Sequence, residues 1–184
     1  MNLGGLNWID LILLFLVIAS LAVGFAQGLL RQVIGLAALY VATILATQYY
    51  TTLGDFIRAI IFQPTSRFLN AISFFIIVVV VWMIISWLAF DAYSTTKIRL
   101  LPLVDQLGGS ILSLVTLVAT LSLVLPIITF AVGESWPGNE VTRASIEQGI
   151  QTARLVPVFE AIKPLFLSAI LPWLPHGLPS IFNL

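Results

Sequence analysis

The ionisable side chains of this sequence lie at the ends of long apolar runs. Asp10 opens the first run, Asp91 closes the third and Asp105 precedes the fourth. No carboxylate, lysine, arginine or histidine lies near the centre of a run. Proton relays and ion-coupled sites need such a group, because a charge at that depth is costly and is kept only where it serves a task. The sequence therefore argues against a proton-coupled transporter and against a voltage sensor.

The motifs of common enzymes are also missing. The chain contains neither the H-E-x-x-H pattern of zinc proteases nor the G-x-S-x-G nucleophile elbow, and it has no cysteine. His176 has no second histidine or cysteine with which to bind a metal, so we interpret it as an ordinary interfacial residue. Gly108-Gly109 lacks the lysine of a phosphate-binding loop. We expect no enzymatic activity, no cofactor and no metal.

The composition indicates an integral membrane protein. Hydrophobic residues make up 60% of the 184-residue chain and charged residues only 9%. A soluble helical bundle of this size could not bury so much apolar surface and would aggregate. The formal net charge is zero, which argues against a nucleic-acid partner. No basic residue precedes the first apolar run, so we expect that run to be a retained span rather than a cleaved signal.

The apolar runs predict an all-α fold with four transmembrane helices within residues 1–132. Their lengths place the spans at about 8–28, 32–50, 71–90 and 106–130. Only Arg31 separates the first two runs, and one helix through both would be about 60 Å long, twice the hydrocarbon thickness. The chain must therefore turn close to Arg31. Pro126 is expected to end the fourth helix or to kink its last turn.

The segments outside the spans are more polar. Residues 51–70 are expected to form a short interfacial helix, FIRAIIF, followed by a turn. Residues 133–184 are expected to form a polar turn and then an amphipathic tail, which lies on the membrane surface or packs on the spans. The final segment contains Pro172, Pro175 and Pro179 and cannot be a regular helix.

Small residues recur every three or four positions on three of the expected helices. These stripes are Ser20, Gly24 and Gly28, then Ala38, Ala42 and Ala46, and finally Gly109, Ser113, Thr116 and Thr120. In lipid, small side chains let helix backbones approach closely and gain dispersion energy. The stripes predict packing within the bundle, or a surface for another membrane protein or a second copy. The hydroxyls of the third stripe could alternatively line a pore or bond to their own backbone.

The charges flanking the spans set an expected orientation. Arg31, Lys97 and Arg99 share one side of the membrane, and Arg58, Arg67 and Arg143 share the other. The tally is tied. The first span has Asp10 before it and Arg31 after it, which favours the Arg31 side as cytoplasmic and both termini as external.

Three motifs together give the chain its resemblance to a known family. They are Trp8-Ile9-Asp10, the segment 24–32 with sequence GFAQGLLRQ, and the segment 104–109 with sequence VDQLGG. In this order and spacing they resemble the colicin V production protein (CvpA) family over residues 7–130. Gln27 and Gln106 stand where the family often has basic residues.

The resemblance implies a multi-span protein of the bacterial inner membrane, linked to peptide toxin production or export and to envelope phenotypes. The candidate packing or interaction residues are those of the matching motifs: Gly24, Gly28, Arg31, Asp105, Gly108 and Gly109. Their chemistry indicates architecture rather than catalysis.

We therefore expect a non-enzymatic protein that assists peptide toxin export or envelope homeostasis. The expected partners are the lipid bilayer and other membrane proteins, or further copies of the chain in a homo-oligomer. One alternative is a small oligomeric channel or transporter in which the Gly109–Thr120 stripe faces a pore. Another is an accessory subunit of a larger energy-transducing membrane complex.

Overall fold

The computed structural model describes residues 6–61, 66–94, 102–133, 139–170 and 172. Within these ranges the chain forms helices and no β-strand. The helices are α1 (Trp8–Gln27), α2 (Leu29–Ile61), α3 (Ser66–Ser94), α4 (Pro102–Gly133), α5 (Glu140–Thr152) and α6 (Val156–Ile170). Helices α1 to α4 are each long and apolar enough to cross a membrane. This confirms the predicted all-α membrane fold with four spans.

The spans are longer than the sequence suggested, and the separate interfacial helix is not found. Helix α2 continues without interruption to Ile61, because no proline occurs in this stretch before Pro64. Gly54 does not interrupt it, since Gly54 is buried against the side chain of Asn70 on α3. Helix α4 likewise continues through Pro126 to Gly133, so the proline does not end it. Membrane helices tolerate such prolines where neighbouring groups satisfy the backbone.

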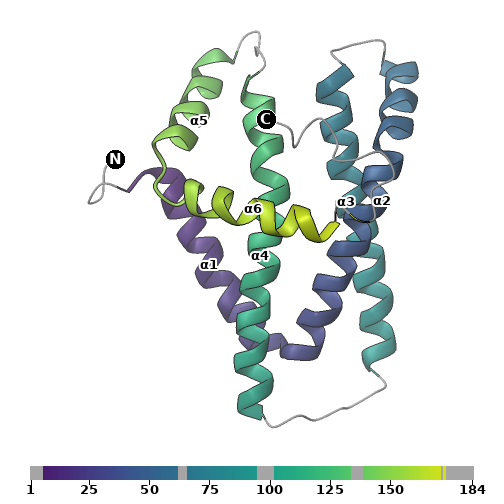
Figure 1. Ribbon diagram of the computed structural model, residues 1–184, viewed down its shortest axis with the longest axis vertical. Helices are drawn as coiled ribbons and strands as arrows, with labels where there is room; N and C mark the ends of the chain where they lie inside the picture. The colour runs from purple at the N-terminus through teal and green to yellow at the C-terminus, as the bar shows by residue number, and fades with distance from the viewer. Residues whose placement is uncertain (1–5, 62–65, 95–101, 134–138, 171, 173–184) are drawn as a thin grey trace.

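The spans form two pairs that meet along α2 and α4. Helix α1 packs on α4, α3 packs on α2, and the contact between α2 and α4 joins the pairs (Figure 1). The core between α2, α3 and α4 is built on the fully buried Phe74 and on small residues such as Ala42 and Ala46. A second core joins α1 to α4 around Leu13, Leu121 and other apolar residues.

The amphipathic tail packs on the spans. It consists of two helices rather than one, and α6 lies across the face of α4 in Figure 1. Phe159 near its beginning joins the core of α1 and α4, and Leu167 near its end joins the core of α2 and α3. The Tyr40 hydroxyl also donates a hydrogen bond to the Ala169 carbonyl (3.0 Å). Helix α6 therefore bridges the two pairs of spans. His176 and the other residues of 173–184 lie outside the described part.

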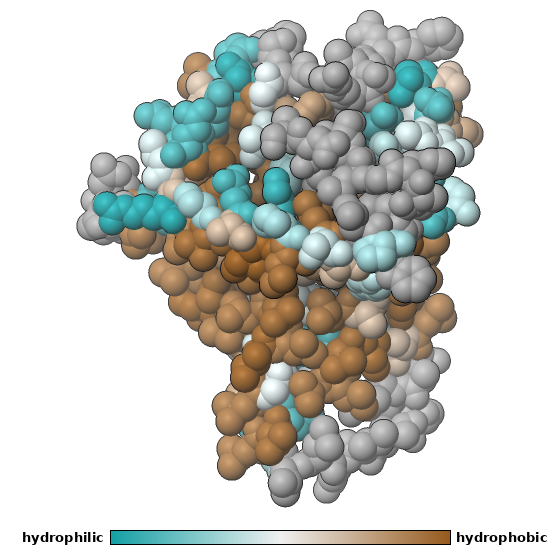
Figure 2. Space-filling model, in the orientation of Figure 1, coloured by the Kyte–Doolittle hydropathy of each residue, from teal (hydrophilic) through white to brown (hydrophobic). Residues whose placement is uncertain are grey.

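The hydropathy of the surface changes at the level of α6. Figure 2 shows hydrophobic side chains below α6, a mixture along α6, and hydrophilic ones over α5 and the neighbouring ends of α2 and α3. Helix α2 has 33 residues and α4 has 32, so each is about 50 Å long against about 30 Å of hydrocarbon. We call the part that projects beyond the hydrophobic band the head. It comprises α5, residues 51–61 of α2, residues 126–133 of α4 and the first turns of α3.

Arg143 ties α5 to the rest of the head. Its guanidinium bonds to Glu140 (2.7 Å) and Glu147 (3.0 Å) on its own helix and donates to the Val132 carbonyl at the end of α4 (2.9 Å). Arg58 pairs with Asp55 (3.3 Å) in the same head. Arg31 lies at the opposite end of α2, as the separation of the two charge groups predicted. Lys97 and Arg99 lie outside the described residues.

Candidate functional site

The turn between α1 and α2 consists of a single residue, Gly28. Its φ of 80° lies in a region that side-chain-bearing residues rarely adopt, and its N–H donates to the Gly24 carbonyl (3.0 Å). A Cβ atom at this position would also collide with the Asp105 carboxylate. Both the backbone conformation and the space therefore require glycine. The expected turn near Arg31 lies three residues before it.

Asp105 caps the helix that follows this turn. The first N–H groups of a helix have no partner within the helix, and they attract negative charge. The Leu29 N–H, the first of α2, donates to Asp105 Oδ1 (2.9 Å), although 76 residues separate the two in sequence. A carboxylate on the first turn of α4 thus acts as the N-terminal cap of α2. The contact fixes the α1–α2 hairpin against α4.

Asp10 has a parallel role at the other end of α1. Its side chain is 0% exposed. One carboxylate oxygen accepts the Asn7 N–H before α1, and the other accepts the Leu155 N–H before α6, each at 2.9 Å. The Asn7 side chain adds bonds to the Gly149 carbonyl (2.8 Å) and the Thr152 hydroxyl (2.7 Å) at the end of α5. Asp10 therefore holds the beginnings of two helices together and anchors the tail to the first span.

The small-residue stripes of α1 and α4 face each other. A Cβ atom added at Gly24 would collide with the Gly109 carbonyl and with Ser113, so the two backbones are in direct contact. The hydroxyls of Ser20 and Ser113 lie 2.8 Å apart, and Ser113 also donates to the Ser20 carbonyl (2.7 Å). Such close approach is the packing mode of small residues in membrane helices.

The remaining stripe and Gly108 also pack inside the chain. Gly108 lies against the Leu29 side chain beside the hairpin. The alanine stripe of α2, made of Ala38, Ala42 and Ala46, is buried. Of the six candidate residues, Gly24, Gly28, Asp105, Gly108 and Gly109 meet where the hairpin contacts α4. Arg31 is placed differently, because it lines a cavity.

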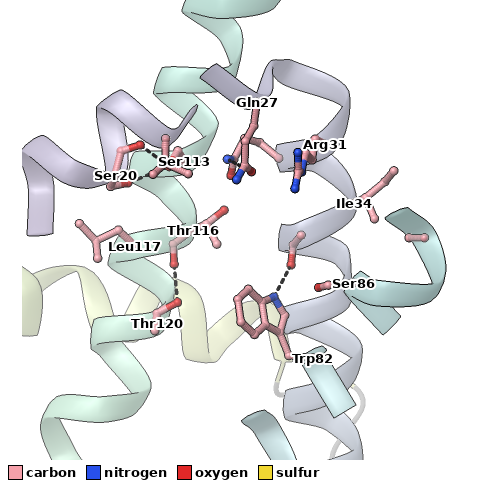
Figure 3. A pocket seen from close by; sticks show the side chains of 14 residues that line it. Ser20, Gln27, Arg31, Ile34, Trp82, Ser86, Ser113, Thr116, Leu117 and Thr120 are labelled. Carbon is pink, nitrogen blue, oxygen red and sulfur yellow. Dashed lines mark hydrogen bonds between the residues drawn. The ribbon is translucent and has the colours of Figure 1, made fainter. Parts of the chain in front are cut away.

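This cavity lies between the two pairs of spans and has a volume of about 390 Å³. Ligand pockets commonly measure about 300–1,000 Å³, so the space is large enough for part of a small molecule. Its lining comes from all four spans: Ser20, Val23, Gln27, Arg31, Gln32, Ile34, Gly35, Trp82, Ser86, Ala89, Ser113, Thr116, Leu117 and Thr120. Figure 3 shows Gln27 and Arg31 near one end, and Trp82 and Thr120 near the other.

The polar groups of the cavity divide into two kinds. Thr116 and Thr120 donate to carbonyls of their own helix, at 2.9 and 2.8 Å, and Trp82 Nε1 donates to the Gly35 carbonyl (3.2 Å). Gln32 Nε2 donates to Gln27 Oε1 (3.1 Å). By contrast, Ser86 Oγ is buried and has no hydrogen-bond partner among the described residues. Buried polar groups are seldom left unpaired, so the Ser86 hydroxyl can form a hydrogen bond with a ligand in the cavity.

No motif in the sequence marks Trp82, Ser86 or Gln32 as site residues. A usable signal exists in the spacing, because Trp82 and Ser86 are four residues apart and share one face of α3. Gln27 and Arg31 are also four apart, but Gly28 separates the helices that carry them. Among the described residues, no group of three His, Cys, Asp or Glu side chains is placed to hold a metal ion.

The fold and the site define a class: a four-span helical membrane protein whose spans enclose a cavity, with a two-helix tail anchored on the first span. The family model described as colicin V production protein matches residues 9–164. The chain therefore belongs to the colicin V production protein family, as its three motifs indicated. The match extends past residue 130, where the sequence resemblance ended, through α5 into α6. No curated protein and no solved structure matches the chain.

Proposed function

We propose that this chain is a non-enzymatic protein of the bacterial inner membrane that assists peptide toxin export or envelope homeostasis by contacting other membrane proteins. Membership of the colicin V production family supports the membrane setting and the process. The glycines of the small-residue stripes and the alanine stripe, which suggested such contacts, pack within the chain. The contact surface must therefore lie elsewhere.

The head carries the observation that supports this proposal. Phe56 and Ile60 are each 63% exposed and lie four residues apart, on one face of α2. Phe56 lies about 40 Å along the helix from Leu29, beyond the reach of about 30 Å of hydrocarbon. The neighbouring Asp55–Arg58 ion pair fits an aqueous surrounding. Large apolar side chains exposed together outside the bilayer are typical of protein contact sites.

A photoreactive amino acid at position 56 or 60 tests the proposal in living cells. We expect covalent adducts with another membrane protein, and we expect the double variant Phe56→Glu, Ile60→Glu to lose co-purification of that protein in mild detergent. Thr51→Glu is the matched control, because Thr51 is exposed on the same helix but points away from this face. A chain that remains monomeric, with no adduct at either position, would contradict the proposal.

A channel or transporter is the second candidate, favoured by the threonine hydroxyls beside the cavity. Ser113, Thr116 and Thr120 all line the open space, and Ser113 is also hydrogen-bonded to Ser20. Since the chain has no cysteine, single cysteines can be introduced without background. A water-filled path predicts that cysteines at Thr116 and Thr120 react with water-soluble thiol reagents. Reaction only at a head position such as Thr51 would exclude that path.

A further inference from the structure

We propose that the cavity between the spans holds part of one anionic phospholipid, with the phosphate beside Arg31 and a stretch of acyl chain along the apolar wall. The proposal concerns the cavity and does not depend on the contact surface of the head. It rests on where the cavity lies, on the chemistry of its two parts and on a buried hydroxyl in its wall.

The charge of the lining favours an anionic lipid phosphate. Among the described residues of the lining, Arg31 is the one with a charged side chain, and none of these described residues is acidic. Arg31 lies in the first turn of α2, at the end of the span, where an arginine side chain can reach the level of the lipid phosphates. Its planar guanidinium suits the oxygens of a phosphate, to which it can donate two parallel hydrogen bonds.

The neighbouring glutamine extends this polar end. Gln27 Oε1 accepts the bond from Gln32, whereas Gln27 Nε2 has no acceptor among the described residues. The Gln27 amide can therefore donate to a phosphate or ester oxygen. The Asp105 carboxylate, which faces this end of α2, is already engaged by the Leu29 N–H. Arginine and amide donors together favour an anionic ligand over a cationic one.

The rest of the lining favours a lipid acyl chain. The apolar part of the wall is built from Val23, Ile34, Leu117, Ala89 and the ring of Trp82. The threonine hydroxyls in this part bond to their own backbone, so they present little unsatisfied polarity. A free anion would leave these apolar side chains facing water, whereas an acyl chain covers them.

Ser86 gives an independent indication of an occupant. Its hydroxyl lies in the wall of the cavity, is buried and has no partner among the described residues. A rotation about χ1 directs such a hydroxyl toward a ligand. The ester carbonyl that joins a phosphate-bearing glycerol to its acyl chain is an acceptor between the polar and apolar parts. Phospholipids provide this combination of phosphate, ester and chain in the membrane that surrounds the protein.

Native mass spectrometry of the full chain released from nanodiscs tests the proposal. The nanodiscs contain phosphatidylglycerol and phosphatidylcholine in equal amounts. We expect one retained phosphatidylglycerol per chain. Arg31→Gln should lower its retention about tenfold, the loss expected for a charge-assisted contact, while Arg31→Lys, which keeps the charge but not the paired donors, should lower it less. Arg58→Gln is the control, because Arg58 lies in the head and pairs with Asp55. Equal losses in Arg31→Gln and Arg58→Gln would overturn the proposal.

A second pair of variants keeps the charge and fills the space. Ile34→Trp adds bulk inside the cavity, whereas Val33→Trp adds it on the exposed side of the same helix. We expect Ile34→Trp to displace the lipid and Val33→Trp to retain it, with both variants keeping the helical circular dichroism of the parent. Equal retention in these two variants would show that the lipid binds elsewhere and would overturn the proposal.

Two further measurements separate the other possible occupants. A large excess of inorganic phosphate should not displace the lipid, and displacement would show a site for the free anion instead. A photoreactive amino acid at Ile34 should form an adduct with the mass of a lipid. An adduct with a second copy of the chain or with another protein would show that a protein fills the cavity, and it would likewise overturn the proposal.

Discussion

Asp10 and Asp105 satisfy helix ends that lie far from them in sequence. Asp10 accepts a hydrogen bond from the Leu155 N–H, 145 residues later in the sequence. Asp105 accepts one from the Leu29 N–H, 76 residues earlier. In the interior of a membrane protein, such an N–H has few alternative partners, and leaving it unpaired costs free energy. The two acidic residues of the family motifs thus each satisfy backbone N–H groups at helix ends.

The conformation and packing of Gly28 allow a direct prediction about stability. Gly28→Ala should destabilise the protein by about 1–3 kcal/mol, because alanine is strained at positive φ and its Cβ would meet Asp105. Gly35→Ala is the matched control, since no atom lies within 4 Å of a Cβ added there. Thermal unfolding of both variants in the same detergent measures the difference. Equal melting temperatures would contradict the role assigned to Gly28.

Helix α6 is the element that the sequence described least well. Its apolar residues recur at helical spacing, which predicted an amphipathic helix but not whether the helix faces lipid or protein. The structure places Phe159 and Leu167 in two different cores, so α6 packs across α4 and contacts both pairs of spans. Periodicity identifies an apolar face, but it does not identify the surface that covers the face.

The attachment of α6 depends on Asp10, and this can be tested. Asp10→Ala should lower the free energy of unfolding by about 2 kcal/mol or more, because it leaves the Leu155 and Asn7 N–H groups without their acceptor. It should also loosen α6, so that a cysteine at Phe159 reacts faster with a thiol reagent than in the parent background. Asp55→Ala serves as the control, since Asp55 is exposed. An unchanged rate at position 159 would show that Asp10 does not anchor α6.

The whole molecule was predictable in outline from length and composition. The four spans and the turn near Arg31 follow from run lengths set against bilayer thickness, and the structure confirms the four-span fold. The partners of each helix were not predictable, because the stripes of α1 and α4 show small residues without showing what they face. The long-range caps of Asp10 and Asp105 were equally hidden, since no local pattern encodes a bond across the fold.

The protruding head makes a prediction for the intact membrane. Cysteines at Thr52 and Val141 should react with a membrane-impermeant reagent from the same side, because both lie in the head. A cysteine at Leu103, near the beginning of α4, should react only from the opposite side. A cysteine at Phe15, which is exposed on a span, should be shielded by lipid from both sides. Labelling of Thr52 and Val141 from different sides would contradict the arrangement.

The caps also impose an order on how the chain is completed during synthesis. When α1 and α2 emerge from the ribosome, the acceptor for the Leu29 N–H has not yet been made, because Asp105 follows 76 residues later. The single-residue turn at Gly28 joins the two helices into one hairpin, and the first N–H of α2 lacks this acceptor until α4 has been synthesised. The Leu155 N–H that bonds to Asp10 is made later still, because 145 residues separate the two in sequence. A chain truncated before α4 would therefore present a hairpin in which the first N–H of α2 lacks its carboxylate acceptor.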